Sequence, residues 1–218
     1  VETIGNAHLS FYLSLGARER ILTLDDLHGK KIRSMDPLVG NTVLSAWGAS
    51  PITMAFGEVP SALQTGTIDA LATSVGGWLT VREQAPYFTV FGVGGMQTDL
   101  YYIGVNKQWW EGLNEPTRQA LQELVNEMTE LSDQITYCDD QMAVKKYGTE
   151  DPSKEGIYIL TEEQKKPFRE ALGNKVVEVL KSKLPSDAHE WIDRFGEEGR
   201  ALSQQYPEGS DSLEQTDC

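Results

Sequence analysis

The chain has 218 residues, a formal net charge of −14 at pH 7 and 39% hydrophobic residues. This length allows one large or two small cores, and the hydrophobic content is typical of a soluble protein. The acidic balance argues against nucleic acid or an anionic membrane as partner, because phosphate binding needs clustered lysine and arginine, and it favours a monomer. We find no run long enough for a membrane span and no basic-then-apolar leader, so a signal peptide is absent from this chain.

The first third of the sequence alternates between strand and helix patterns. Residues 1–21 alternate loosely between apolar and polar side chains, which predicts a strand. A short helical turn at 23–27 is followed by a strand at 31–35, a helix at 40–47 and a strand at 52–54. This order predicts an α/β fold with a largely parallel sheet.

A further helix and strand follow in the stretch 54–73. The helix is expected to begin near Gly57 and to end at Gly66, where a left-handed cap stops it. An apolar strand at 68–72 comes directly after it. The next residues, TSVGGW, are small enough to let the backbone approach a ligand or another segment closely.

The second half of the sequence is mainly helical. After strand patterns at 90–93 and 101–105, apolar residues at steps of three, four and seven predict one helix over 117–142. Such a helix is about 39 Å long, so we expect it to run along two domains. The remaining predicted elements are a strand at 156–160, helices at 161–172, 176–184 and 189–202, and a polar tail.

The two cysteines, Cys138 and Cys218, have no CxxC or cysteine–histidine spacing suited to a metal. Cys138 lies on the apolar side of the predicted long helix, so a buried free thiol is one interpretation. A disulfide with the C-terminal residue is the other, and it would indicate a non-cytosolic compartment. We favour the disulfide as a hypothesis.

Enzyme signatures are missing from the sequence. The three histidines, His8, His28 and His189, lie in segments of different character, and none accompanies a nucleophile motif such as GxSxG. There is also no Walker loop, GxGxxG or HExxH. Adjacent aspartates at 25–26 and 139–140 point in different directions and are interpreted as solvated surface groups. We therefore expect no catalytic residue, no metal site and no cofactor.

Arg33 lies in the middle of an apolar strand pattern. An arginine is uncommon there unless it is paired, and its guanidinium matches a carboxylate in two parallel hydrogen bonds. The alternatives are that it pairs with Asp36 or extends to the surface. Phe56 and Thr73, near the two ends of the stretch 54–73, also have simple explanations, as a core residue and as the end of a strand.

Three long segments together resemble one known family. They are DDLHGKKIR at 25–33, WGASPITMAFGEVPSALQTGTIDA at 47–70 and LYYIGVNKQWWEGLNEPTRQAL at 100–121. This pattern is similar to the extracytoplasmic solute-binding proteins of tripartite ATP-independent periplasmic (TRAP) transporters, of the DctP type. The resemblance covers 21–131 well and the remainder by its order of elements.

The resemblance implies a two-lobed α/β fold of the periplasmic-binding-protein type, type II-like, in which an organic anion binds between the lobes. Arg33 matches the family's carboxylate-binding arginine, and Phe56 matches the aromatic position that packs on the ligand. Thr73 falls where many members have an asparagine that bonds the carboxylate. Asp36 and Trp78 are expected as specificity contacts.

The resemblance also implies a domain division. Residues 1–98 are expected to be mainly the lobe that carries Arg33, and 99–140 the return to the first lobe and the spanning helix. Residues 141–203 follow as a strand and helices packing on both lobes, and 204–218 as the tail. Because family members carry a substantial segment before the point where this chain begins, we expect the first lobe to be incomplete.

The implied function is the capture of a small carboxylate-bearing solute in the periplasm by a monomer that delivers it to the membrane subunits of a TRAP transporter. A ligand-sensing domain of the same fold is one alternative. A hydrolase acting on a sugar acid is another.

Overall fold

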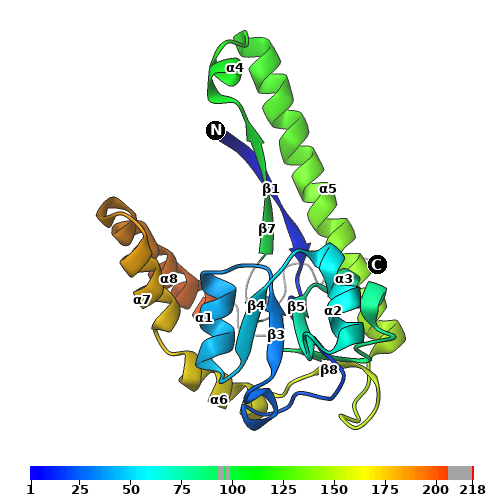
Figure 1. Cartoon of the computed structure of the whole chain (residues 1–218). Helices are drawn as coiled ribbons and strands as arrows, with labels where there is room; N and C mark the ends of the chain where they lie inside the picture. Colours follow the sequence, from blue (N-terminus) through cyan, green and yellow to red (C-terminus); the bar gives the residue numbers. More distant parts are fainter. Residues whose placement is uncertain (93–95, 97–98, 206–217) are drawn as a thin grey trace.

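Two β-sheets organise the computed structural model, which describes residues 1–92, 96, 99–205 and 218 (Figure 1). The strands are β1 (Glu2–Ser10), β2 (Ser14–Ala17), β3 (Lys31–Ser34), β4 (Ser50–Thr53), β5 (Ala70–Thr73), β6 (Tyr87–Val90), β7 (Asp99–Val105) and β8 (Gly156–Ile159). One sheet has the order β4-β3-β5-β2-β6-β8, and the other consists of β1 and β7. The expected α/β fold is confirmed.

The six-stranded sheet is mixed because of β2. The neighbours β3/β4, β3/β5 and β6/β8 are parallel, whereas β2 is antiparallel to both β5 and β6. The prediction of a largely parallel sheet is therefore wrong at its centre. The single strand predicted over 1–21 is divided into β1 and β2. The chain leaves the two-stranded sheet after Ser10 and enters the larger sheet at Ser14.

Helices cover both faces of the larger sheet (Figure 1). They are α1 (Val39–Ala46), α2 (Val59–Thr65), α3 (Val75–Val81), α4 (Lys107–Glu111), α5 (Glu115–Tyr147), α6 (Glu162–Leu172), α7 (Lys175–Lys183) and α8 (His189–Gln205), with single 3₁₀ turns η1 (Asp25–Leu27), η2 (Phe56–Glu58) and η3 (Ser186–Ala188). The predicted cap at Gly66 is confirmed by its φ of 72°. α3 and α4 were not predicted.

An aromatic cluster joins α1 and α6 to the sheet. Trp47 stacks on Phe91 at 4.9 Å between ring centroids, and Phe168 meets Phe91 edge-on at 5.1 Å. The Trp47 indole N–H donates to the carbonyl of Phe168 at 2.9 Å, so this buried donor is satisfied. The cluster fixes α1 and α6 against the same face of the sheet.

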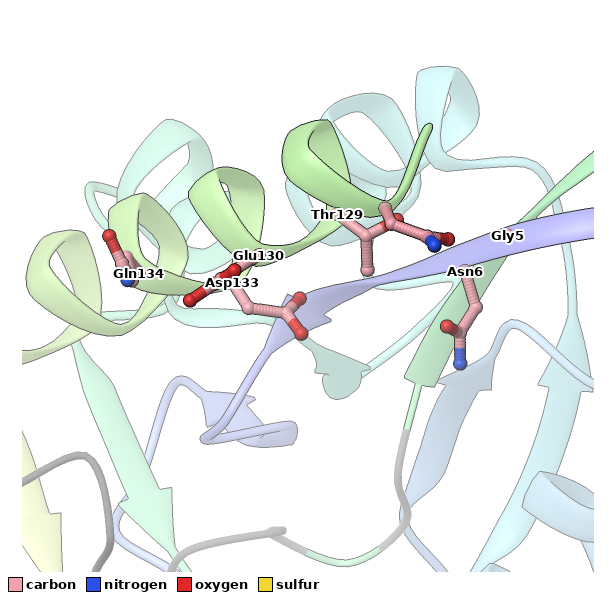
Figure 2. A pocket seen from close by; sticks show the side chains of 7 residues that line it. Gly5, Asn6, Thr129, Glu130, Asp133 and Gln134 are labelled. Atoms are coloured by element: carbon pink, nitrogen blue, oxygen red, sulfur yellow. The ribbon is translucent and has the colours of Figure 1, made fainter. Parts of the chain in front are cut away.

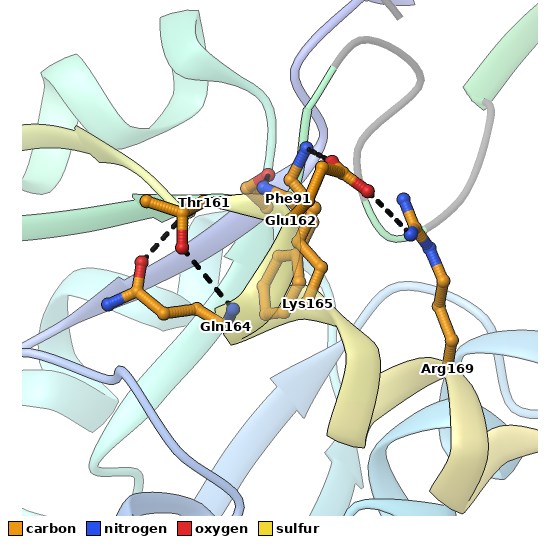
Figure 3. A network of polar contacts seen from close by, with 7 residues as sticks. Phe91, Thr161, Glu162, Gln164, Lys165 and Arg169 are labelled. Carbon is orange, nitrogen blue, oxygen red and sulfur yellow. Dashed lines mark hydrogen bonds and ion pairs between the residues drawn. The ribbon is translucent and has the colours of Figure 1, made fainter. Parts of the chain in front are cut away.

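Polar contacts fix the start of α6 (Figure 3). Thr161 and Gln164 form a capping box, because the Thr161 hydroxyl accepts from the Gln164 N–H and the Gln164 side chain accepts from the Thr161 N–H. The buried Lys165 donates to Glu162 at 2.7 Å, and Arg169 bonds the other oxygen of the same carboxylate. The buried ammonium is therefore paired, as its burial requires.

The long helix α5 runs beside β1 and away from the larger sheet (Figure 1). It has 33 residues, about 50 Å at 1.5 Å per residue, and begins after Asn114, whose side chain accepts from the Thr117 N–H. The prediction of one long helix is confirmed. Its apolar residues Leu124, Met128 and Leu131 are at least half exposed. No helix in the described ranges combines the length and hydropathy of a membrane span.

Near its C-terminal end, α5 is fastened to the connection between β1 and β2. The carboxylate of Asp140 accepts from the Ser10 hydroxyl and the Phe11 N–H, both at 2.8 Å. The interpretation of Asp140 as a solvated surface group is therefore wrong, since its exposure is 4%. Cys138 forms a disulfide with Cys218, which confirms the favoured hypothesis.

Candidate functional site

The carboxyl ends of β3, β4 and β5 bring three predicted residues to one edge of the sheet. Arg33 lies on β3, where it stands opposite Ile52 of β4 and Leu71 of β5. Phe56 follows β4, and Thr73 is the last residue of β5. In open α/β sheets, ligands bind outside the carboxyl ends of the parallel strands. This edge is therefore the candidate site.

Arg33 is buried beneath this edge, with 4% of its surface exposed. Its Nε donates to the carbonyl of Met54 at 3.2 Å, and its Nη1 donates to the carbonyl of Ala72 at 3.0 Å. The alternative in which Arg33 extends to the surface is therefore wrong. The two carbonyls hold the planar, positively charged guanidinium in one orientation.

Phe56 lies against Arg33. The guanidinium carbon is 5.5 Å from the centroid of the ring, within the range of a cation–π contact. Phe56 is 36% exposed, so it presents apolar surface next to the buried charge. The turn that carries it is fixed by Glu58, whose carboxylate accepts from the Ala55 N–H at 3.2 Å. A charge and an apolar surface thus lie side by side.

Thr73 is the last residue of β5 at this edge of the sheet. It pairs with Ser14 of β2 and is buried. The next residue, Ser74, caps α3, because its hydroxyl oxygen accepts from the Gly77 N–H at 3.0 Å. The small residues after β5 therefore form the first turn of α3. The backbone of Gly77 closely approaches the side chains of Thr73 and Phe56, which is the close approach to another segment that the sequence predicted.

Both of the expected specificity contacts, Asp36 and Trp78, have contacts within the fold. Asp36 caps α1, because its carboxylate accepts from the N–H groups of Leu38 and Val39 at 2.8 Å. Trp78 is 1% exposed, stacks on Phe88 at 5.3 Å, and its indole N–H donates to the carbonyl of Ala85 at 2.7 Å. We correct the expectation for Trp78 accordingly: its ring fills the core and its polar atom is already satisfied.

A separate hollow between α5 and β1 suits an anion less well (Figure 2). It is lined by Gly5, Asn6, Asn126, Thr129, Glu130, Asp133 and Gln134. These seven residues include two carboxylates and no cationic side chain, so they would repel a negative ligand. Within the described part of the chain, no three metal-ligating side chains gather that could hold an ion.

Comparison with known families gives one match over most of the chain. Residues 8–183 match the family model described as DctP, bacterial extracellular solute-binding protein, family 7. The chain is 31% identical over 150 residues to the C4-dicarboxylate-binding periplasmic protein DctP of Rhodobacter capsulatus, covering 68% of this chain and 44% of that protein. It is 29% identical over 176 residues to the 2,3-diketo-L-gulonate-binding periplasmic protein YiaO of Escherichia coli, covering 79% and 51%.

Among solved structures, the periplasmic ectoine-binding protein of the TeaABC TRAP transporter from Halomonas elongata has the same fold. Its TM-score is 0.76 at 23% identity, and the match covers 92% of this chain and 63% of that one. The chain spans about half the length of the curated relatives it matches.

Proposed function

This chain belongs to the bacterial extracellular solute-binding proteins of family 7, and we propose that it binds a small carboxylate-bearing organic solute and delivers it to the membrane subunits of a TRAP transporter. The members of this family are binding proteins rather than enzymes. Capture and release, without chemical change of the solute, is therefore the proposed activity.

The observation that carries this proposal is the placement of Arg33. It lies at the carboxyl ends of parallel strands and is held in one orientation by the carbonyls of Met54 and Ala72. A guanidinium fixed in this way has less rotamer freedom to lose when a carboxylate binds in a bidentate manner. Each charge-assisted hydrogen bond contributes roughly 1.5–3 kcal/mol, so two of them make the arginine the main anchor.

Phe56 and Thr73 have secondary roles in the proposed site. The exposed part of the Phe56 ring would pack on the carbon skeleton of the solute, because it offers apolar surface next to the charge. The Thr73 hydroxyl would add a hydrogen bond at the end of β5. An acid with a short carbon skeleton satisfies all three groups.

The names of the relatives support the solute class and the compartment. One relative is named for C4-dicarboxylates and another for 2,3-diketo-L-gulonate, and both are named as periplasmic proteins. We accordingly propose that this protein acts in the periplasm as a monomer. The disulfide between Cys138 and Cys218 agrees with an oxidising compartment.

The two sheets suggest how the lobes are divided. We assign the larger sheet with Arg33 to one lobe, and β1, β7, α4 and the first part of α5 to the other. The exposed apolar side chains of the second group, such as Tyr102 and Met128, support an assignment to a lobe that this chain contains only in part. Closure of the lobes would be driven by contacts that the solute makes only in the closed state.

A binding screen tests the proposal. The full chain is mixed with succinate, malate, D-glucuronate, D-galactonate and orotate, and a rise in melting temperature identifies binding. Calorimetry then compares the wild type with Arg33→Ala, Arg33→Lys and Arg18→Ala. Arg18 is exposed and serves as the control for the loss of one positive charge. We expect Arg33→Ala to weaken binding about a hundredfold or more, because two charged hydrogen bonds are lost.

The variants also separate binding from folding. Arg33→Ala leaves the carbonyls of Met54 and Ala72 without these donors, so the melting temperature of the unliganded variant has to be measured as well. Arg33→Lys keeps the positive charge but lacks the two parallel N–H groups that bind a carboxylate in a bidentate manner, and we expect an intermediate affinity. Unchanged affinity in a folded Arg33→Ala variant would contradict the proposal, as would product formation from any acid of the screen.

A further inference from the structure

Two consecutive glycines in the first turn of α3 have different surroundings. A Cβ placed on Gly76 meets no atom within 4 Å. A Cβ placed on Gly77 would lie 2.2 Å from the Thr73 Oγ1, 3.2 Å from the Ser74 Oγ and 3.4 Å from the Phe56 Cε2. The Thr73 hydroxyl thus occupies the space that a side chain at position 77 would need.

We propose that Gly77 is a positioning residue of the solute site: its missing side chain allows the Thr73 hydroxyl to point toward the bound acid beside Phe56. This inference rests on the proposed function. Glycine has no side chain that could bind the solute, so Gly77 acts through Thr73 and need not touch the solute itself.

The backbone around this contact has little freedom to relieve a clash. Thr73 ends β5, which is paired with β2 on one side and β3 on the other. Gly77 is held by the hydrogen bond from its N–H to the Ser74 hydroxyl. An added methyl group at position 77 would therefore have to be accommodated mainly by the Thr73 side chain, with a smaller shift of the Ser74 hydroxyl.

Threonine can make this adjustment in one way only. Its Cβ carries a hydroxyl, a methyl and a hydrogen, and its χ1 angle is restricted to staggered positions. Of the three substituents, only the hydrogen is small enough to face a methyl group at position 77. The hydroxyl would therefore turn away from its present place. Phe56 need not move, because 3.4 Å is an ordinary contact distance for carbon.

The matched pair Gly77→Ala and Gly76→Ala tests the proposal. Both changes replace glycine by alanine in the same helical turn, so their effects on backbone entropy are similar. With the tightest-binding acid of the screen, we expect Gly76→Ala to bind within about twofold of the wild type. We expect Gly77→Ala to bind about tenfold more weakly, which corresponds to the loss of one hydrogen bond to a charged group.

A double variant separates a positioning role from a general loss of structure. In Thr73→Ala the obstructing hydroxyl is absent, so adding Gly77→Ala should change the affinity less than twofold. A tenfold loss in that background would overturn a role exerted through Thr73. Thr73→Val, which keeps the shape but removes the hydroxyl, should itself bind about tenfold more weakly. Wild-type affinity in Thr73→Val would overturn the proposal even if Gly77→Ala failed to fold.

Failure of this inference can be distinguished from failure of the proposed function. If Arg33→Ala abolishes binding while Gly77→Ala binds as Gly76→Ala does, the role of Gly77 is refuted and the carboxylate site stands. If no acid of the screen binds the wild type, both are refuted.

Discussion

Asp140 offers the sharpest test of how this fold is held together. Its carboxylate accepts hydrogen bonds from the Ser10 hydroxyl and the Phe11 N–H, at the point where the chain passes from one sheet to the other. Asp140→Ala would leave these two donors without their acceptor in a buried place. An unsatisfied buried donor costs about 1–3 kcal/mol, so we expect the free energy of unfolding to fall by about 2–5 kcal/mol.

Asp140→Asn should behave differently, because its amide oxygen can accept both hydrogen bonds without a charge. Burial raises the pKa of Asp140 above its ordinary value of 3.8, although the hydrogen bonds from Ser10 and Phe11 act in the opposite direction. The folded protein therefore binds this proton more tightly than the unfolded chain does. The stability that this bound proton contributes is fully present below pH 3.8 and is lost as the pH rises through the folded pKa.

Asparagine does not titrate, so the stability of Asp140→Asn relative to the wild type should increase from about pH 4 upward and then level off. Urea unfolding at a series of pH values, followed by tryptophan fluorescence, measures this difference. The exposed neighbour Asp139 provides the control, since Asp139→Asn removes the same charge without a buried contact. A free energy of unfolding of Asp140→Ala within 0.5 kcal/mol of the wild type, about the spread of ordinary surface substitutions, would refute the role of these hydrogen bonds. A stability of Asp140→Asn relative to the wild type that falls with rising pH would refute the raised pKa.

Two further predictions concern long-range contacts. The Arg20 guanidinium donates to four backbone carbonyls, those of Phe88, Pro152, Lys154 and Gly156. Arg20→Lys should therefore lower the free energy of unfolding by about 2 kcal/mol. Arg18→Lys, at an exposed position, is the control, and equal urea midpoints for the two variants would contradict this prediction. The disulfide joins residues 80 apart, so Cys138→Ser should lower stability by about 2–4 kcal/mol. A melting temperature that does not respond to reductant would argue against it, provided that mass spectrometry shows two alkyl groups added after reduction.

Much of the fold between 31 and 73 could be predicted from local patterns. The period of the apolar residues changes between strand and helix there, and Gly48 and Gly66 end α1 and α2 with positive φ angles of 87° and 72°. The helix α3 was missed because two glycines stand in its first turns, where they are unfavourable. Burial of Val75, Trp78 and Val81 outweighs this local preference.

The division of residues 1–21 into two strands could not be predicted, because it depends on partners far along the chain. Asp140 holds Ser10 and Phe11 from a sequence distance of about 130 residues, and no local pattern reports such a contact. The same holds for Arg20, whose acceptors lie on β6, before β8 and at the first residue of β8. Arg33 was recognisable because a charged residue interrupts an apolar strand, which is a local signal. Trp78 was misassigned because an aromatic residue next to small residues fits a core as well as a pocket.

The connection at residues 10–12 has consequences for both sheets. Tyr12 is bonded through its hydroxyl to the Gln141 side chain at 2.8 Å, one residue beyond Asp140 on α5. Since α5 also lies against β1, α3 and β8, it contacts both sheets as well as the connection between them. The relative orientation of the sheets therefore depends on contacts distant in sequence from Arg33. Unfolding experiments on Asp140 variants measure how much the contacts between the sheets stabilise the fold. Binding experiments on Arg33 variants measure the affinity for the solute at the edge of one sheet, so the two sets of variants distinguish loss of the fold from loss of binding.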